Sequence, residues 1–316
     1  TSSSTTSGDW VSIGSDKKTL RLGAKNGDKG DYIRVITAAQ GNLAPVARDD
    51  SGTVNENSTL TVDDGDNPSS VSALTHDSSP KDVSSEDTAP RGITFNNDGT
   101  KMYVTGTAGN DINEYTLTTA FDVSTASYRD NFAFGGDAMS VKFNNDGTKM
   151  FTASTGGIKE FLLNTAFDIT TTANGNTPET TYSVSGQDAN PFGLDFNNDG
   201  TKMFMTGNST DFIYEYSLSV GFDLSSTVTL LRSLDLDDYD VEPFGIEFNT
   251  DGTRMFIVGT LGNGVDEYKL TTGFDISTAS HVCFLGVSSQ EVNPSGIAFN
   301  NDGSKMFIVG NSGDEV

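Results

Sequence analysis

The sequence predicts an all-β chain whose larger part is a β-propeller of four-stranded blades. The phrase Phe-Asn-Asn-Asp-Gly-Thr-Lys-Met returns five times with small changes. The aspartates of its copies stand at 98, 146, 199, 251 and 302, in steps of 48, 53, 52 and 51 residues. Alternating apolar residues without a 3.6-residue period indicate strands rather than helices. A repeated unit of this length cannot bury its apolar faces alone, so neighbouring copies must form a shared core.

The first two strands of each unit form a hairpin around the Asn-Asp-Gly turn. The first strand alternates, as in Gly193–Phe196, and the second is apolar on both faces, as in Met255–Val258. A strand of the second kind is typically covered on two sides. Asp-Gly between such runs marks a tight turn, because glycine reaches positive φ without steric cost. We therefore expect positive φ at the five turn glycines, Gly99, Gly147, Gly200, Gly252 and Gly303.

The second half of the unit supplies two more strands. A third strand such as Ile112–Leu117 leads into a polar connection built on Phe-Asp, where Asp and Ser/Thr side chains can close local turns. A fourth strand, such as His281–Leu285, completes the unit. Four short antiparallel strands in a repeat of this length indicate a propeller blade. The expected blades are 91–137, 138–190, 191–242 and 243–293, with part of another from 294.

The fifth repeat reaches only the start of its third strand, at Val316. Residues 70–75 precede the first inner strand as a fourth strand would, so a ring could borrow them, but a third strand would still be missing. An incomplete ring exposes unpaired strand edges. We therefore expect four full repeats plus part of a fifth in this chain, and six or more blades in the complete protein. The alternative is a five-bladed ring completed by another chain.

The first 68 residues differ in composition from the repeats. Residues 1–41 form a small predicted β module with a flexible Ser/Thr-rich start and strands at Trp10–Ile13, Thr19–Leu22 and Tyr32–Ile36. Residues 42–68 form a connector, and the propeller occupies 69–316.

Two stretches resemble known families. Inner strands such as Pro191-Phe192-Gly193-Leu194-Asp195-Phe196 follow the pattern P-x-G-φ-x-F-x-x-D-G, which resembles the YVTN, NHL and gluconolactonase-like propellers. That resemblance covers roughly 69–316 and implies architecture rather than activity. Asn42–Val62, which contains Ala-Pro-Val-Ala-Arg-Asp-Asp, resembles the joint of cadherin-like and VCBS-type repeats in large secreted adhesins. This second resemblance implies an extracellular, β-rich connector.

The amino-acid composition limits the classes of molecule that this protein can bind. With 44 acidic and 19 basic residues the formal net charge is −25, which disfavours nucleic acids and anionic membrane surfaces. No stretch is long and apolar enough to cross a membrane. The single cysteine, Cys283, excludes an internal disulfide and lies in an apolar run typical of a buried thiol. We expect an extracellular, cell-surface or virion-associated protein.

Candidate catalytic residues are few. The two histidines, His76 and His281, fall on predicted outer strands, which leaves little material for a catalytic triad or a histidine metal site. Asp195, Asn197 and Asp199 match the start of an EF-hand loop, but Thr206 stands where the bidentate glutamate is required. The other copies carry Thr94, Lys142, Glu247 and Ala298 at the first ligand position, so we interpret the repeated turn as structural. Calcium is a hypothesis for the connector alone, at Asp49, Asp50, Glu56, Asp63 and Asp64.

The gluconolactonase resemblance implies a metal held by residues just before the glycine of the inner strands. Those positions hold poor ligands, namely Arg91, Ser140, Phe192, Phe244 and Ser295. The candidate ligand-binding residues lie near the channel mouth and are Asn190, Phe192, Glu242, Phe244, Asn293 and Asp137. A glutamate recurs on every complete third strand, at 114, 160, 215 and 267, which favours a role in building the blade.

Three classes of function remain open. The repeated residues have structural explanations and candidate catalysts are scarce, so the sequence favours a non-enzymatic binding and display module, a rigid head on a surface adhesin or fibre. Its partner would be a surface glycan, a protein, or a neighbouring subunit. The alternatives are a structural subunit of a viral tail, fibre or capsid appendage, and a secreted metal-dependent lactonase-like hydrolase.

Overall fold

The computed structural model describes residues 10–13, 20–23, 71, 74–77, 79–236, 242–259 and 263–316. The chain divides into two compact units, 1–64 and 65–316. In the first unit, β1 (Trp10–Ile13) and β2 (Leu20–Gly23) form an antiparallel hairpin, in agreement with two predicted strands. The third predicted strand, Tyr32–Ile36, and the 42–68 connector lie outside the described residues.

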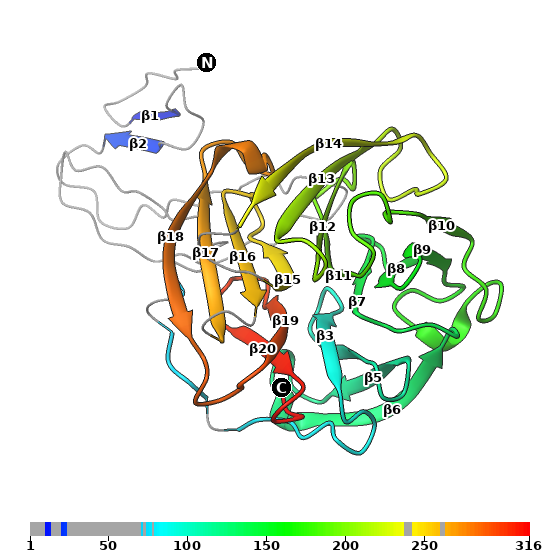
Figure 1. Ribbon diagram of the computed structural model, residues 1–316. Helices are drawn as coiled ribbons and strands as arrows, with labels where there is room; N and C mark the ends of the chain where they lie inside the picture. The colour runs from blue at the N-terminus through cyan, green and yellow to red at the C-terminus, as the bar shows by residue number, and fades with distance from the viewer. Residues whose placement is uncertain are drawn as a thin grey trace. The chain divides into compact units, whose positions relative to one another are not determined.

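The second unit is all-β, and four four-stranded antiparallel sheets form blades of a propeller (Figure 1). The first blade holds β3 (Pro90–Phe95), β4 (Lys101–Gly106), β5 (Asp111–Leu117) and β6 (Ala126–Ala133). The second holds β7 (Ser140–Phe143), β8 (Lys149–Ser154), β9 (Gly157–Leu162) and β10 (Thr180–Tyr182). The third holds β11 (Pro191–Phe196), β12 (Lys202–Gly207), β13 (Phe212–Leu218) and β14 (Val228–Asp235). The fourth holds β15 (Pro243–Phe248), β16 (Arg254–Gly259), β17 (Gly264–Leu270) and β18 (Ala279–Gly286).

A further sheet has two strands, β19 (Pro294–Phe299) and β20 (Met306–Gly310), and we call it the fifth sheet. Short 3₁₀ turns stand before the fourth strand of three blades, at η2 (Val123–Thr125), η3 (Ile169–Thr171) and η4 (Ile276–Thr278). No helix in the described ranges is long and apolar enough to cross a membrane.

The Asn-Asp-Gly hairpins adopt the predicted backbone. The five turn glycines have φ between 64° and 71°, which confirms the sequence prediction. In each turn the aspartate accepts the backbone N–H two residues on, for example Thr201 N to Asp199 Oδ1 over 3.0 Å. A Cβ on Gly200 would lie 2.2 Å from the Phe222 ring, so the turn requires glycine for space as well as for φ.

The Phe-Asp connections carry four phenylalanines in the left-handed region. Phe121, Phe167, Phe222 and Phe274 have φ of 53–56°. Each aspartate that follows accepts a nearby backbone N–H, as Asp122 accepts Ser124 N over 3.2 Å. The predicted local closure by Asp and Ser/Thr side chains is confirmed. The strained phenylalanine places its ring beneath the turn glycine of the same blade.

Buried glutamates of the third strands link each blade to the next. Lys149 pairs with Glu160 over 2.7 Å, and the other glutamate oxygen accepts Leu224 N of the third blade over 2.8 Å. The same arrangement recurs at Glu114, Glu215 and Glu267, each of which accepts a backbone N–H from the following blade. The recurring glutamates therefore build the propeller, as the sequence predicts, and their side chains join blades as well as strands.

The ring closes between β19 and β3. Asn301 Nδ2 donates to Asn97 O over 2.8 Å, which repeats the link from Asn97 to Asn145 O over 2.7 Å. A Cβ on Gly296 would lie 2.6 Å from Arg91 O, so the two inner strands approach as closely as their counterparts elsewhere in the ring. The expectation of six or more blades differs from this arrangement, because β19 packs directly against β3 and leaves no space for a sixth blade between them.

Residues 81–83 occupy the position that a fourth strand of the fifth sheet would take. Val83 N donates to Asp314 O over 2.9 Å, and Asp82 stands opposite Glu315. The third blade has the same register, where Leu236 N donates to Asp211 O over 2.9 Å. The possibility that a ring borrows residues 70–75 for this position is therefore replaced by residues 81–83. Val71 instead stands where a blade turns into its fourth strand, since its N–H donates to Glu267 Oε2 over 3.1 Å.

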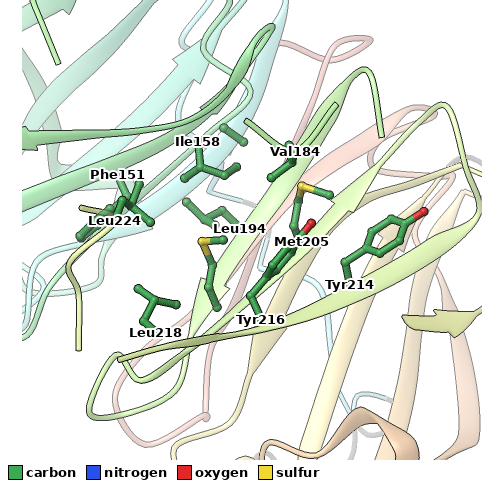
Figure 2. Close-up of a cluster of buried hydrophobic side chains, with 11 residues drawn as sticks. Phe151, Ile158, Val184, Leu194, Met205, Tyr214, Tyr216, Leu218 and Leu224 are labelled. Atoms are coloured by element: carbon green, nitrogen blue, oxygen red, sulfur yellow. The ribbon is translucent and has the colours of Figure 1, made fainter. Parts of the chain in front are cut away.

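The core lies between neighbouring blades. Figure 2 shows Phe151 and Ile158 of the second blade against Leu194, Met205 and Leu218 of the third. All of these side chains are at most 3% exposed. Because each four-stranded blade buries both faces against a neighbour, the second strands of the blades are apolar on both sides, in agreement with the sequence prediction.

Candidate functional site at the central channel

The inner strands β3, β7, β11, β15 and β19 surround a narrow space that we call the central channel. Its cavity has a volume of about 20 Å³, which is room for about one water molecule. Glycines make the strands approach closely: a Cβ on Gly193 would lie 2.4 Å from Phe244 O of the neighbouring strand. The channel is therefore too narrow to admit an organic substrate.

An aromatic layer occupies the end of the channel where the inner strands begin. The rings of Phe192 and Phe244 lie 4.6 Å apart, and the Arg91 guanidinium stands 6.0 Å from the Phe192 centroid. The two phenylalanines are only 6% and 8% exposed. These two predicted site residues do meet, but as a buried pair that fills the channel.

The register of the second blade differs from the alignment made on the sequence. Ser140 pairs with Ala153, as Gly92 pairs with Thr105, so Ser140 occupies the glycine position. Met139 therefore corresponds to Arg91. The residues before the glycine position are an arginine, a methionine, two phenylalanines and a serine, and this set does not fit a metal ion.

A charged layer lies farther along the channel and was not predicted as a site. Lys142 of β7 bonds to Glu247 of β15, and its Nζ lies 3.3 Å from Asp195 Oδ1 of β11. Asp195 also accepts Phe248 N over 2.8 Å. The side chains of these three residues are 12–17% exposed. Together they form one buried cation between two acids, which we call the channel triad.

Burial and charge shift the pKa values in the channel triad. Burial raises the pKa of Glu247 to about 7, although Lys142 opposes the shift. Burial disfavours the charged form of Lys142, but Asp195 and Glu247 outweigh it and raise its pKa. Glu247 thus titrates close to neutral pH, beside a lysine that stays protonated.

One sequence signal could have revealed the channel triad. Its members occupy the position before the phenylalanine of each inner strand, where the five copies carry Thr94, Lys142, Asp195, Glu247 and Ala298. In a repeat this uniform, one inward-facing position with changing charge marks a place where copies differ in role. As candidate calcium ligands of a local loop these residues show no relation to one another in the sequence, and their meeting across the axis was not predicted.

The remaining predicted site residues lie in loops that lead into the inner strands. Asn190 and Asn293 are exposed, and their side chains donate to Ser209 and Ser312 of the neighbouring loops. Thr155 donates to Asp137 over 3.0 Å, while Glu242 is exposed immediately before β15. These four residues therefore lie in the loops that precede the inner strands, away from the channel triad.

Buried carboxylates fix the conformation of those loops, and these carboxylates were not predicted as functional residues from the sequence. Asp188 is 2% exposed and accepts the backbone N–H groups of Asn190, Ser209 and Thr210 over 2.7–3.1 Å. Asp87 and Glu291 make the same kind of bonds in their own loops. A buried acid in each of three loops holds the exposed residues in place.

The other candidate groups have structural partners. His281 lies on the outer strand β18, as predicted, and its Nε2 is 2.6 Å from Asp266 Oδ1. Cys283 is half-buried, and its Sγ lies 3.4 Å from Glu267 Oε2. Within the described ranges no three His, Cys, Asp or Glu residues are grouped as a metal site. The proposed calcium residues, Asp49, Asp50, Glu56, Asp63 and Asp64, lie outside those ranges.

Comparison with known proteins finds similarity among solved structures. No protein-family model matches the chain, and no curated protein matches it in sequence. A protein of unknown function from Desulfotomaculum acetoxidans is 12% identical with a TM-score of 0.44, over 70% of this chain and 62% of that one. The periplasmic gluconolactonase PpgL of Pseudomonas aeruginosa is 14% identical with a TM-score of 0.41, over 70% and 63%.

A luciferin-regenerating enzyme is 10% identical with a TM-score of 0.45, over 74% of this chain and 88% of that chain. The matched part therefore spans about three fifths of the first two structures and most of the third. Identities and TM-scores this low carry no inference about the activity of this chain.

Proposed function

We propose that this protein is a non-enzymatic, extracellular binding and display module, in which a rigid propeller presents its loops to a surface glycan or protein partner. The observation that supports this most is the filled central channel. Its cavity is about 20 Å³ and its aromatic layer is buried, so a partner would meet the loops rather than the axis. Shallow polar loops on a stiff scaffold suit macromolecular or glycan partners.

The loops have features that suit such recognition. They are ordered by buried carboxylates such as Asp188, and they display Asn190, Glu242 and Asn293 to solvent. Preordered loops lose little conformational entropy when a partner binds. The net charge of −25 adds a preference for neutral or basic surfaces. We propose calcium only for the connector residues Asp49, Asp50, Glu56, Asp63 and Asp64.

The test is binding of the full chain to glycan arrays and to cell surfaces. We expect saturable binding that weakens in an Asn190→Ala, Asn293→Ala double variant. Asn174→Ala, an exposed asparagine in a loop of the second blade, is the matched control and should keep full binding. Binding that the double variant leaves unchanged would contradict the proposed face.

A structural fibre or virion subunit is the second candidate, and exposed apolar side chains on outer strands favour it. Leu231 of β14 is 43% exposed, while Val282 and Phe284 of β18 are 47% and 44% exposed. Apolar residues on edge strands are typical of surfaces that another subunit covers. Sedimentation of wild type and of a Val282→Thr, Phe284→Thr variant tests it, because a fibre contact predicts assembly that the variant loses.

The lactonase-like alternative would use Glu247 as the proton-transferring group beside the protonated Lys142, and it requires the channel to open. Lactone and ester hydrolysis, measured with and without divalent metals, tests this alternative. Turnover that Glu247→Gln abolishes in a folded protein would favour an enzyme over a binding module.

A further inference from the structure

The channel triad holds one lysine amine against two carboxyl groups. Lys142 Nζ bonds to the Glu247 carboxylate and lies 3.3 Å from Asp195 Oδ1. The three side chains come from the inner strands of three complete blades, β7, β11 and β15. One ammonium neutralises only one carboxylate, and a buried charge is costly unless it is paired. Ion pairing therefore explains one of the two acids and leaves the second without a role.

The surroundings of the triad are apolar and nearly dry. Leu194, Ile246 and Ile297 line the same cavity as Lys142. The cavity is about 20 Å³, which is room for about one water molecule. Burial disfavours an ammonium and a carboxylate relative to neutral groups, because the ions lose their hydration. A reaction that turns the two ions into a neutral amide and releases one water is therefore favoured at this place.

The two acids differ in how they are held. Asp195 accepts two backbone N–H groups, from Phe196 to Oδ1 over 2.9 Å and from Phe248 to Oδ2 over 2.8 Å. These donors fix the carboxyl group beside Lys142 and stabilise negative charge that develops on its oxygens. Burial raises the pKa of Glu247 to about 7, so its carboxyl can both accept and release a proton near neutral pH. Asp195 thus suits the role of electrophile, and Glu247 suits proton transfer.

We propose that Lys142 and Asp195 condense to a side-chain amide across the channel, with Glu247 as the proton carrier. Glu247 takes one proton from the Lys142 ammonium, and the free Nζ lone pair attacks Asp195 Cγ. The new N–C bond forms, and the bond from Cγ to Oδ1 breaks. Two protons that began on Nζ pass through Glu247 to Oδ1, which leaves as water. Nothing is oxidised or reduced, and Glu247 ends in its starting state.

The ion pair at 3.3 Å is the state before this bond forms. The neighbouring acids raise the pKa of Lys142, so the reaction waits on proton transfer to Glu247 and follows folding. Fixed proximity compensates, since well-oriented groups react as if at effective concentrations on the order of 10⁵ M or more. The amide would tie the second blade to the third covalently. It is independent of the loop face proposed for glycan or protein binding, so either proposal can fail without the other.

The experiment measures the intact mass of the full chain under denaturing conditions, after the folded protein has been kept at neutral pH. We expect a mass one water below that of the sequence. Proteolysis and tandem mass spectrometry should then give a branched peptide that joins Lys142 to Asp195. Lys149 is the internal control, because it pairs with Glu160 over 2.7 Å but has no second described acid within ion-pair distance. Lys149 should stay unlinked.

Variants test the role of each group. Asp195→Ala should have the full sequence mass, because the electrophile is gone. Glu247→Gln keeps both reacting groups and should slow bond formation on the order of 10²-fold. Glu179→Gln, at an exposed position of the second blade, is the matched control and should form the amide at the wild-type rate. Asp-Gly sequences also lose water when they close to a succinimide, but mild base reverses that loss and leaves a side-chain amide intact.

Three outcomes would overturn the proposal. The first is folded wild-type protein that keeps its full sequence mass after prolonged incubation, a result that needs no variant to fold. The second is a base-stable loss of water that persists in Asp195→Ala, because the bond would then lie elsewhere. The third is a branched peptide that joins Lys142 to Glu247, which would reverse the roles assigned to the two acids.

Discussion

At the scale of single residues, the turn glycines meet two requirements at once. Gly200 has φ of +69°, and a Cβ there would lie 2.2 Å from the Phe222 ring. Gly175 has φ of +59° but open space around its Cβ position. A comparison of alanine substitutions at these two positions therefore separates the cost of backbone strain from the cost of a steric clash.

We predict that Gly200→Ala lowers the free energy of unfolding by about 2–4 kcal/mol, through left-handed strain and overpacking together. Gly175→Ala, the matched control, should cost about 1 kcal/mol because only the backbone strain applies. Urea denaturation measures both changes. Equal effects would show that the Phe222 ring moves aside without cost.

The channel triad makes a second prediction, concerning pH. Folded Glu247 keeps its proton up to about pH 7, whereas an unfolded glutamate loses it near its ordinary value of 4.5. The folded state therefore holds more protons between these two pH values, so the contribution of Glu247 to stability falls as pH rises through this window.

We expect Glu247→Gln to remove that decline. The difference in unfolding free energy between variant and wild type should grow in favour of the variant from about pH 4.5 to 7 and then level off. Urea titrations at several pH values measure it. Glu242→Gln, at an exposed position, should keep the wild-type slope. A constant difference between Glu247→Gln and wild type would disprove the raised pKa.

At the scale of the elements, each third strand joins its own blade to the next through one buried glutamate. Glu160 is 3% exposed and holds both Lys149 of β8 and the backbone N–H of Leu224. Its removal takes the carboxylate from the partly buried Lys149 ammonium, which keeps its bond to Phe222 O over 2.7 Å, and leaves the Leu224 amide without its acceptor.

We predict that Glu160→Ala lowers stability by about 3 kcal/mol. A Lys149→Met, Glu160→Leu double variant should recover part of this loss, because apolar groups then replace both charges. Lys269→Met, an exposed lysine of β17, is the control and should change stability by less than about 0.5 kcal/mol. Thermal and urea unfolding measure the stability of each variant. If the double variant loses as much stability as its two substitutions lose when made singly and added together, the two charges are uncoupled.

At the scale of the whole molecule, two distant parts of the chain close the ring. Val83 is 1% exposed and packs with Phe307 and Val309, more than 200 positions later. Its backbone N–H also bonds to Asp314 O. Stability of the fifth sheet should therefore depend on this early segment.

We predict that Val83→Ala lowers stability by about 2 kcal/mol and speeds hydrogen exchange first in β19 and β20. Val220→Ala, at a position that is 55% exposed, should be close to neutral. Hydrogen exchange followed by mass spectrometry resolves the two sheets. Loss of protection spread evenly over all blades would show that the ring opens as one unit.

The sequence by itself determined the blade, because a blade is a local object. The Asp-Gly hairpins, the Phe-Asp turns and the third-strand glutamates such as Glu160 all act within one repeat or between adjacent repeats. The repeat period and the alternation of apolar residues can be read directly from the sequence. The all-β propeller, the positive φ values of the turn glycines and the structural role of the glutamates could therefore be predicted.

Only the tertiary structure decided where the ring closes and what fills its axis. Whether β19 meets β3 depends on how closely the glycine-bearing inner strands approach one another. That approach sets the rotation from one blade to the next, and the rotations of all blades add up around the ring. Lys142, Asp195 and Glu247 lie about 50 residues apart in sequence and meet only because five strands converge on one axis. The pairing of 81–83 with 314–316 likewise joins segments from opposite ends of the propeller, a non-local contact that no single repeat encodes.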